Sequence, residues 1–334
     1  MEVDKSNLRE VILNSVKQMN VAPEFYNQLN LNRRAFDKIV LCGMGGSAFI
    51  GDIFSFLKQH SYAPLIVKLP VFIYRSYGLP NSADQNTLVV CVSYSGNTEE
   101  PLSAYEKARQ NNLEIAAVAC GGKLAELCQK NKTPWIKIPE TLQPRFSTGY
   151  QLTALIKIFM AYGLLDSAAN NDLADLPQKV IPAQIELQAK SLCLNLNRKI
   201  PVIYSSDKNW ALARIWKIKF NENAKIPAFW NVFPELNHNE MVGWTNALGP
   251  FHFLFLKDPD DLPRIQKRMQ LTAEMLRQRG LNSNFITIGG SNPLEKLFWA
   301  MAFGDWLSYH LALFYGIDPT PVDMVEEFKK QLNN

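Results

Sequence analysis

The first half of the chain alternates short β-branched apolar runs with segments in which apolar residues recur at helical spacing. Runs of the first kind predict strands, and segments of the second kind predict helices. The predicted strands are 38–42, 71–75, 88–93, 115–119 and 135–138. The predicted helices are 47–59, 98–110, 123–130 and a long apolar segment, 150–165. This order of elements favours a doubly wound α/β sheet with parallel strands.

The second half of the chain repeats the same order of elements, although no residue-level repeat links the two halves. Strands are predicted at 202–205, 227–230, 251–256 and 285–288. Helices are predicted at 183–194, 209–223, 263–279 and 293–314, followed by a C-terminal helix near 322–332. Between the halves lies a polar segment, DSAANNDLADLP at 166–177, which is typical of a domain boundary. We therefore expect two α/β domains of the doubly wound, parallel-sheet type, at 1–165 and 178–334.

Composition narrows the class of protein. The 334 residues are 47% hydrophobic and 20% charged, which excludes general disorder. Lys and Arg exceed Asp and Glu only by 35 to 31, without a basic block, so neither nucleic acid nor a membrane surface is indicated as a partner. The N-terminus, MEVDKSNLREVILNSV, has the pattern of an amphipathic helix, and no run of about 18 apolar residues is present. We expect a soluble cytoplasmic protein.

Histidine and cysteine usage gives no metal motif. The four histidines, His60, His238, His252 and His310, lie far apart, and no Cys-x-x-Cys pair is present. The five cysteines, an odd number, are typical of reduced core thiols in a cytoplasmic protein. We expect no metal and no cofactor.

A glycine-rich loop follows the first predicted strand. Its sequence is GMGGSA, from Gly43 to Ala48, and a helix is predicted directly after it. Glycines let a ligand approach the backbone, and a helix N-terminus offers free N–H groups and a partial positive charge, so Gly45, Gly46 and Ser47 are candidates for binding an anion. A dinucleotide site is the alternative, but no Asp or Glu occurs between Asp52 and Asp84 to bind a ribose.

A hydroxyl-rich loop follows the third predicted strand, with the sequence SYSGNTEE. Ser93, Ser95 and Thr98 surround a glycine at a strand-to-helix turn, and short hydroxyls match the acceptor oxygens of a phosphate monoester. Ordinary turn chemistry, with Thr98 capping the helix, is the alternative. Because both loops follow strands of one parallel sheet, where ligands of open α/β sheets bind, we favour a small phosphorylated ligand.

These loops resemble those of the sugar isomerase (SIS) domain, a phosphosugar-binding module. KFNENAK at 219–225, FPELNHNEMVGW at 233–244, PRFSTGY at 144–150 and the tail DPTPVDMVEEFKKQL resemble segments of the bifunctional phosphoglucose/phosphomannose isomerases. The resemblance extends over essentially the whole chain. It implies two SIS domains and a cofactor-free enzyme that interconverts glucose 6-phosphate or mannose 6-phosphate with fructose 6-phosphate through an enediol.

Glu222 is the candidate base for that proton transfer. It closes an apolar stripe on the predicted helix 209–223 that consists of Ala211, Ile215 and Ile218. From the pattern alone, a solvated glutamate paired with Lys219 or Lys225 remains the alternative. The resemblance implies that Glu222 is the catalytic base, because it matches the glutamate that has this role in the family.

The resemblance implies roles for two further side chains. His238, in a polar stretch after Pro234, matches a histidine that opens the sugar ring and reaches the active site of the neighbouring subunit, which implies a homodimer. Arg145 follows Pro144 at the start of a predicted helix, where a guanidinium could stabilise the enediolate oxygen. A surface position is the alternative for both residues.

The C-terminal tail holds two weaker candidates. Lys329 matches a lysine that enters the active site in the family, although the adjacent Lys330 leaves the register open by one residue. Thr320, between two prolines, is a candidate for the sugar pocket, where a small side chain would admit either epimer.

Three other functions remain as alternatives. A non-catalytic phosphosugar regulator would usually carry a DNA-binding segment, for which the N-terminal helix is too short and too weakly basic. An aminosugar synthase needs a nucleophilic cysteine near its start, whereas the first cysteine here is Cys42, inside a predicted strand. A nicotinamide dehydrogenase is disfavoured by the missing ribose-binding acid.

Overall fold

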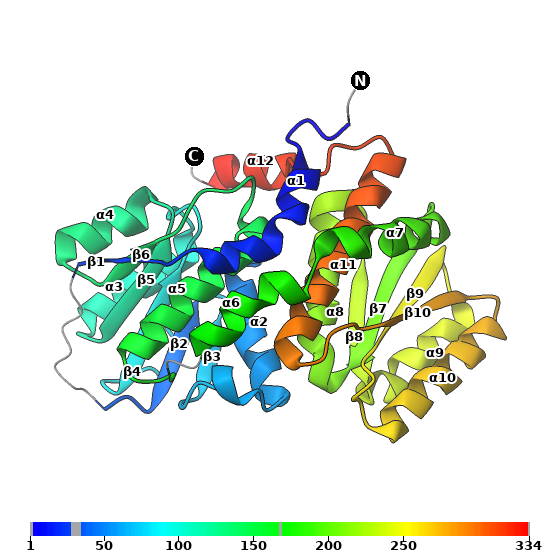
Figure 1. The fold of residues 1–334 in the computed structure, drawn as a ribbon, viewed down its shortest axis with the longest axis horizontal. Coiled ribbons are helices and arrows are strands. Elements are labelled where there is room, and N and C mark those ends of the chain that lie inside the picture. Colours follow the sequence, from blue (N-terminus) through cyan, green and yellow to red (C-terminus); the bar gives the residue numbers. More distant parts are fainter. Residues whose placement is uncertain (1–2, 28–34, 167–168, 333–334) are drawn as a thin grey trace. The chain divides into compact units, whose positions relative to one another are not determined.

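The computed structural model describes residues 3–27, 35–166 and 169–332, which form two compact units (Figure 1). The N-terminal unit consists of Asn14–Val180 and Asn292–Leu294. The C-terminal unit consists of Met1–Leu13, Ile181–Ser291 and Glu295–Asn334. The first helix, α1 (Leu8–Leu13), therefore belongs to the C-terminal unit, and the chain passes between the units just after the polar segment 166–177.

The N-terminal unit is built on one sheet with the strand order β1-β6-β5-β4-β2-β3. The strands are β1 (Phe25–Tyr26), β2 (Lys38–Cys42), β3 (Val71–Tyr74), β4 (Thr87–Val92), β5 (Glu114–Ala119) and β6 (Trp135–Lys137). Strands β2 to β6 run parallel, which confirms the predicted sheet, and β1 adds an antiparallel edge. The sequence did not predict β1, because two residues are too short for a periodic signal.

Helices cover both faces of this sheet. They are α2 (Gly45–Gln59), α3 (Glu99–Gln110), α4 (Gly122–Asn131), α5 (Thr148–Ala161) and α6 (Ala169–Lys179). Helices α3 and α4 bury Tyr105 and Leu124 against β2, β4 and β5 in one apolar cluster. Helices α2 and α5 pack against each other, with the rings of Phe54 and Phe159 5.1 Å apart. The doubly wound arrangement is therefore the one predicted from the sequence.

The C-terminal unit has a second, fully parallel sheet with the order β10-β9-β7-β8. Its strands are β7 (Ile200–Ser206), β8 (Phe229–Phe233), β9 (Phe251–Lys257) and β10 (Asn282–Thr287). The main helices are α7 (Pro182–Cys193), α8 (Trp210–Lys219), α10 (Pro263–Arg277), α11 (Pro293–Phe314) and α12 (Asp323–Leu332). The predicted strand 227–230 was placed too early, because Pro227 has no N–H group for a sheet bond and the strand begins at Phe229.

The predicted helix 209–223 has a different form at its C-terminal end. The α-helix ends at Lys219, and the chain continues as a π-helical turn over Phe220–Ala224. The left-handed conformation of Lys225, with φ of 56°, closes this turn. Hydrophobic periodicity cannot predict the wider turn, because the apolar spacing upstream is that of an ordinary α-helix.

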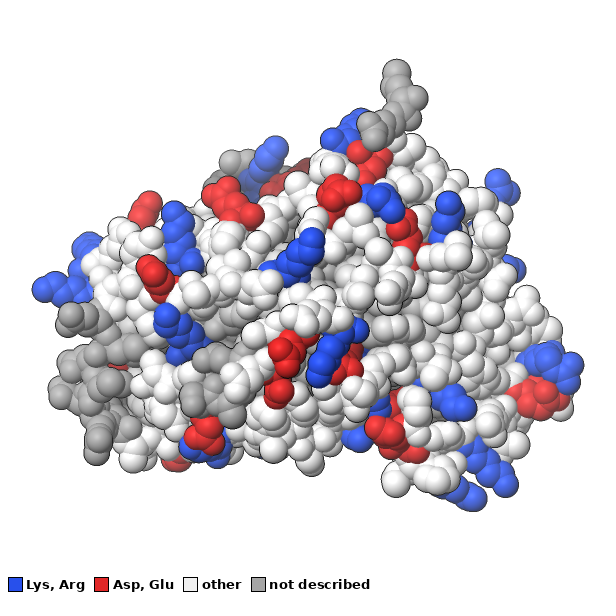
Figure 2. All heavy atoms as spheres, viewed as in Figure 1, with Lys and Arg blue, Asp and Glu red and all other residues white. Residues whose placement is uncertain are grey.

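Burial shifts the pKa of several thiols and imidazoles of the core. The five cysteines are buried and free, and burial raises the pKa of Cys120 to about 11 and that of Cys128 to about 12. Burial also lowers the pKa of His252 and His310. On the face that Figure 2 shows, basic and acidic side chains are interspersed. Within the described part of the chain, no helix combines the length and the apolar character needed to cross a bilayer.

Candidate active site

The glycine-rich loop of the N-terminal unit leads directly into helix α2. Met44 is the N-cap residue and Gly45 begins the helix with φ of +48°, a conformation that favours glycine. Gly46 and Ser47 are buried, whereas Gly45 is exposed. Because the first N–H groups of a helix have no partner within it, this turn can donate hydrogen bonds to an anion.

The hydroxyl-rich loop lies beside the glycine-rich loop. The N–H group of Tyr94 donates to Ser47 Oγ at 3.1 Å, which joins the two loops. Ser93 Oγ donates to Thr98 Oγ1 at 3.0 Å, and the N–H group of Asn97 donates to Ser95 Oγ at 3.2 Å. Thr98 precedes helix α3, but its side chain makes no capping hydrogen bond. Thr98 thus occupies the N-cap position without capping the helix through its side chain, and its hydroxyl contacts Ser93 instead.

Gly96 holds the hydroxyl-rich loop against a third loop. Its φ is +71°, and a Cβ atom at this position would lie 1.8 Å from the carbonyl oxygen of Gly121. The carbonyl oxygen of Gly96 also accepts a hydrogen bond from the N–H group of Leu124 at 2.9 Å. Only glycine fits here, so the hydroxyl groups depend on it for their position.

Arg145 is placed next to the glycine-rich loop. It lies on the 3-10 turn η3 (Pro144–Phe146), and a Cβ atom on Gly46 would lie 2.6 Å from the backbone nitrogen of Arg145. Arg145 is only 1% exposed, so the interpretation as a surface arginine is wrong. Its guanidinium carbon lies 4.6 Å from the ring centre of Phe146, a cation–π contact. The structure thus brings the backbone of Arg145 next to the glycine-rich loop.

Three buried polar residues that the sequence analysis did not single out support the turn that carries Arg145. Ser147 Oγ donates to the carbonyl oxygen of Pro144 at 2.7 Å and accepts from Gln151 Nε2 at 2.6 Å. Gln18 Nε2 donates to the carbonyl oxygen of Phe146 at 2.6 Å. The segment PRFSTGY contains Ser147 and almost reaches Gln151, whereas no local signal connects Gln18 to a turn more than a hundred residues away.

The π turn of the C-terminal unit carries Glu222. The predicted buried stripe continues only as far as Ile215, because the buried face then runs through Lys219 and Asn223. Glu222 itself is half-buried. π turns are rare overall but frequent at functional sites, and this one carries a half-buried carboxylate.

Two buried contacts fix the end of helix α8 to α11. Lys219, which is fully buried, forms an ion pair with Asp305 through its ammonium group. Asn223 Nδ2 donates to Ser308 Oγ at 2.9 Å. Lys219 is therefore buried with Asp305 as an ion-pair partner, whereas the predicted alternative was a solvated pair with Glu222.

Lys225 connects the π turn to the loop that carries Thr320. Its ammonium group donates to the carbonyl oxygens of Glu222 and Asn223, and to that of Pro319 at 3.1 Å. Thr320 is 6% exposed, and its N–H group donates to Asp318 Oδ1 at 3.1 Å. The structure therefore brings the backbone of Glu222 and the segment of Thr320 together within one unit.

His238 and Lys329 lie on the surface of the C-terminal unit. His238 ends the 3-10 turn η7 (Glu235–His238) and is exposed, with no hydrogen bond to another described residue. Lys329 lies on α12, where its side chain is 57% exposed and its ammonium group lies 2.8 Å from Glu326. Lys330 is exposed as well. The side chains of all three residues are exposed in the described chain.

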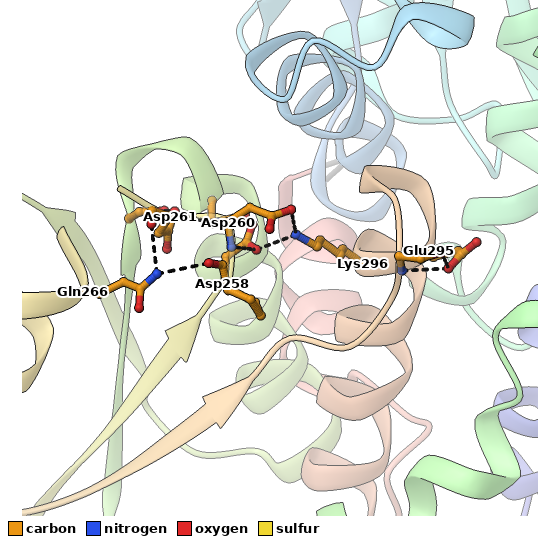
Figure 3. Close-up of polar contacts among 10 residues, drawn as sticks. Asp258, Asp260, Asp261, Gln266, Glu295 and Lys296 are labelled. Carbon is orange, nitrogen blue, oxygen red and sulfur yellow. Dashed lines mark hydrogen bonds and ion pairs between the residues drawn. The ribbon is translucent and has the colours of Figure 1, made fainter. Parts of the chain in front are cut away.

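The strand ends of the second sheet hold a different set of side chains (Figure 3). Lys296 pairs with Asp258 at 2.6 Å and with Asp260 at 2.5 Å, and these two carboxylates raise its pKa although burial lowers it. Asp261 Oδ1 accepts from Ser206 Oγ at 2.6 Å and from Asn209 Nδ2 at 3.3 Å. Three carboxylates would repel a phosphate, so this edge is not a second phosphate site.

Comparisons with known proteins agree with this geometry. Residues 185–332 match the family described as the bacterial phospho-glucose isomerase C-terminal SIS domain. The bifunctional phosphoglucose/phosphomannose isomerase of Caldicellulosiruptor bescii is 36% identical over 338 residues, covering 97% of this chain and 98% of that protein. The one from Aquifex aeolicus is 33% identical over 324 residues, covering 93% and 97%.

Among solved structures, the C-terminal domain of glucosamine-fructose-6-phosphate aminotransferase from Francisella tularensis matches with a TM-score of 0.68 and 15% identity. The match covers 96% of this chain and 100% of that structure, and it concerns the fold alone. Two α/β units, each built on a mainly parallel sheet, and the family match to the second define a protein of the SIS class. Within that class, the chain belongs to the bifunctional phosphoglucose/phosphomannose isomerase family.

We expect Gly46→Ala to lower the free energy of unfolding by about 1–3 kcal/mol, because the new methyl group would overlap the backbone of Pro144 and Arg145. Urea unfolding followed by circular dichroism measures this. Gly243→Ala is the matched control, since nothing lies within 4 Å of its added Cβ atom and its backbone is helical. Equal stability of the two variants would contradict the close approach of η3 to α2.

Asp261 predicts a pH dependence of stability. Burial raises the pKa of its carboxyl to about 6 from the usual 3.8, so between these values the folded protein binds more protons than the unfolded chain. The stability that the protonated Asp261 carboxyl gives to the folded state is therefore fully present below about pH 4. It is lost as the pH rises through about 6. We expect Asp261→Asn to unfold at a higher temperature than the parent at pH 7 and at a similar temperature at pH 4. If the difference in melting temperature between the two proteins stayed the same from pH 4 to pH 7, the raised pKa of Asp261 would be refuted.

Proposed function

We propose that this protein is an aldose–ketose isomerase that interconverts glucose 6-phosphate or mannose 6-phosphate with fructose 6-phosphate. One observation carries the proposal: a chain of this family presents a carboxylate, Glu222, on a π turn anchored by buried contacts. The joined loops of the N-terminal unit, with Arg145 beside them, supply the complementary anion site. A base and an anion site are the two elements that a phosphosugar isomerase needs.

The phosphate group of the sugar binds at the start of helix α2 and at the hydroxyl-rich loop. The backbone N–H groups of Gly45 and Gly46 donate to its oxygens, and Ser47 adds a hydroxyl. Ser95 and Thr98 supply the remaining hydroxyl donors, while Ser93, whose proton is directed to Thr98, holds that side chain in place. Helix N–H groups and hydroxyls suit a phosphate monoester, so Arg145 remains available for the sugar.

Glu222 transfers the proton between carbons 1 and 2 of the open-chain sugar. Its carboxylate takes the proton from one carbon, which leaves an enediolate, and returns it to the neighbouring carbon. Glucose 6-phosphate and mannose 6-phosphate give the same enediol, so one base serves both substrates. Arg145 stabilises the negative charge that develops on the enediolate oxygen.

His238 opens the sugar ring from a neighbouring copy of the chain. The observation in favour is that its side chain is exposed on η7 and makes no hydrogen bond to another described residue. We also propose that Lys329, rather than Lys330, enters the site from α12, and that Thr320 contacts the sugar. The protein thus acts as a homodimer.

The proposed reaction needs no cofactor, because the proton stays within the sugar and the base. The five free thiols suit the reducing cytoplasm, which we propose as its location. Since fructose 6-phosphate is shared by glycolysis and gluconeogenesis, the enzyme serves the hexose phosphate step of both.

Purified protein incubated with fructose 6-phosphate and EDTA should form aldose phosphates, which proton NMR identifies. We expect Glu222→Gln to lower kcat about 10²–10⁴-fold, because it removes the base and keeps the shape of the side chain. Binding of fructose 6-phosphate should stay close to that of the parent, as measured by calorimetry. Glu126→Gln, at an exposed position on α4, is the matched control and should remain fully active. Binding without conversion by the parent protein would refute the proposed activity.

The contribution of His238 across a dimer can be tested by mixing two inactive variants. In a heterodimer of Glu222→Gln and His238→Ala chains, one of the two sites keeps both native residues. Unfolding and refolding an equal mixture should therefore recover about a quarter of the parent activity, because half of the dimers are mixed. Each variant refolded alone should stay inactive. No recovery in a mixture shown to contain heterodimers would place His238 in its own chain's site.

A further inference from the structure

We propose that Glu240 is a positioning residue, which holds the turn of His238 so that the imidazole meets the ring oxygen of the sugar. Glu240 begins the short helix α9 (Glu240–Gly243), directly after η7. The proposal rests on the isomerase activity and on the role of His238 proposed above. It goes beyond them by naming the side chains that fix this histidine in space.

The Glu240 carboxylate is bound at both oxygens by the second sheet. Tyr204 Oη, on β7, donates to Oε1 at 2.5 Å, and Asn231 Nδ2, on β8, donates to Oε2. Tyr204 and Asn231 lie directly opposite each other in the parallel register of these strands. Hydrogen bonds to an ionised acceptor are stronger than those between neutral groups. The carboxylate therefore fixes the first residue of α9 to two paired strands.

Tyr204 is a firm donor in this arrangement. Its side chain is fully buried, and its hydroxyl oxygen accepts from Trp244 Nε1 at 2.8 Å. Burial and the neighbouring Glu240 carboxylate raise the pKa of Tyr204, so the phenol keeps its proton. Trp244 follows the end of α9, so the same hydroxyl is bonded to both ends of this short helix.

The residues just before His238 are anchored as well. Leu236 is fully buried in the apolar core of the C-terminal unit. Asn237 Nδ2 donates to Thr272 Oγ1 at 3.0 Å, and Asn237 Oδ1 accepts from Arg268 Nη1 at 3.1 Å, both partners being on α10. His238 thus lies between an anchor on α10 and an anchor on the sheet.

Asn239 makes the connection from His238 to Glu240 rigid. Its Oδ1 accepts from the N–H group of Glu240 at 2.5 Å, which caps α9. Its Nδ2 donates to Glu235 Oε1 at 2.6 Å, at the start of η7. A movement of Glu240 is therefore transmitted directly to the histidine.

His238 itself differs from these neighbours. Its imidazole is exposed and makes no hydrogen bond to another described residue, although the residues on either side of it are bonded. A surface loop is ordinarily mobile, so anchoring of this kind serves a side chain whose place matters. Proton transfer to a sugar oxygen has this requirement, because a displacement of about 1 Å can lower a rate about a hundredfold.

An open-chain substrate separates the positioning of His238 from a general loss of structure. 5-Deoxyfructose 6-phosphate lacks the hydroxyl group that closes the furanose ring, so its isomerisation needs Glu222 and not His238. We expect His238→Ala to lower kcat/KM for fructose 6-phosphate about tenfold or more. The same variant should convert the 5-deoxy analogue at close to the parent rate, as measured by proton NMR.

Glu240→Ala should reproduce this selective loss without touching the histidine. We expect kcat/KM for fructose 6-phosphate to fall about 10–100-fold and that for the 5-deoxy analogue to stay near the parent value. Glu240→Gln should fall between Glu240→Ala and the parent, because its amide oxygen accepts from only one of the two donors. Glu274→Ala is the matched control: this exposed glutamate of α10 pairs with Arg277, and its loss should change neither rate.

The outcomes separate this inference from the proposed function. If Glu240→Ala slowed both substrates alike, or neither, the positioning role would be overturned and the isomerase would stand. If His238→Ala slowed both alike, ring opening by His238 would be refuted together with this inference. A parent protein that converts neither substrate would refute the isomerase itself.

Discussion

The buried ion pair between Lys219 and Asp305 is the interaction on which the position of Glu222 depends. Removing one partner would leave an uncompensated buried charge, which costs about 3–5 kcal/mol. The bond from Asn223 to Ser308 lies about one turn further along and ties the same segment to α11. Helix α11 is buried over most of its length, so it forms a rigid support. This double anchor explains how the π turn that carries Glu222 is held in place.

A different constraint shapes the N-terminal unit. The carboxyl ends of its parallel strands lie at one edge of the sheet, and the loops that follow them make contact through Ser47 and the backbone of Tyr94. The close approach of Gly96 to Gly121 and of Gly46 to Arg145 leaves no room for side chains. The second sheet has the same parallel arrangement, but carboxylates and Lys296 follow its strands. Similar architecture thus carries glycine-rich and hydroxyl-rich loops in one unit and a cluster of paired charges in the other.

Much of the architecture was predictable because burial on both faces of a parallel sheet leaves a local pattern. Strand β2 and helix α11 have the predicted bounds, and most other elements differ by one to three residues at their ends. Strand β8 was harder to predict, because Pro227 and Asn231 interrupt its apolar run. The π turn could not be predicted from the sequence, because the extra residue in its turn does not change the spacing of the apolar residues upstream. For the same reason, the expected stripe through Ile218 to Glu222 was wrong.

The sequence by itself determined the α/β class, the two loops with phosphate-binding character and the residues that resemble an isomerase family. These are local properties, set by the residues that follow each strand and by the period of apolar positions. Only the tertiary structure decided that Arg145 is buried against Gly46, that Lys219 pairs with Asp305, and that α12 has an uncovered face. Each of these depends on segments distant in sequence, and a local pattern carries no information about which distant side chain will neutralise a charge or cover an apolar surface.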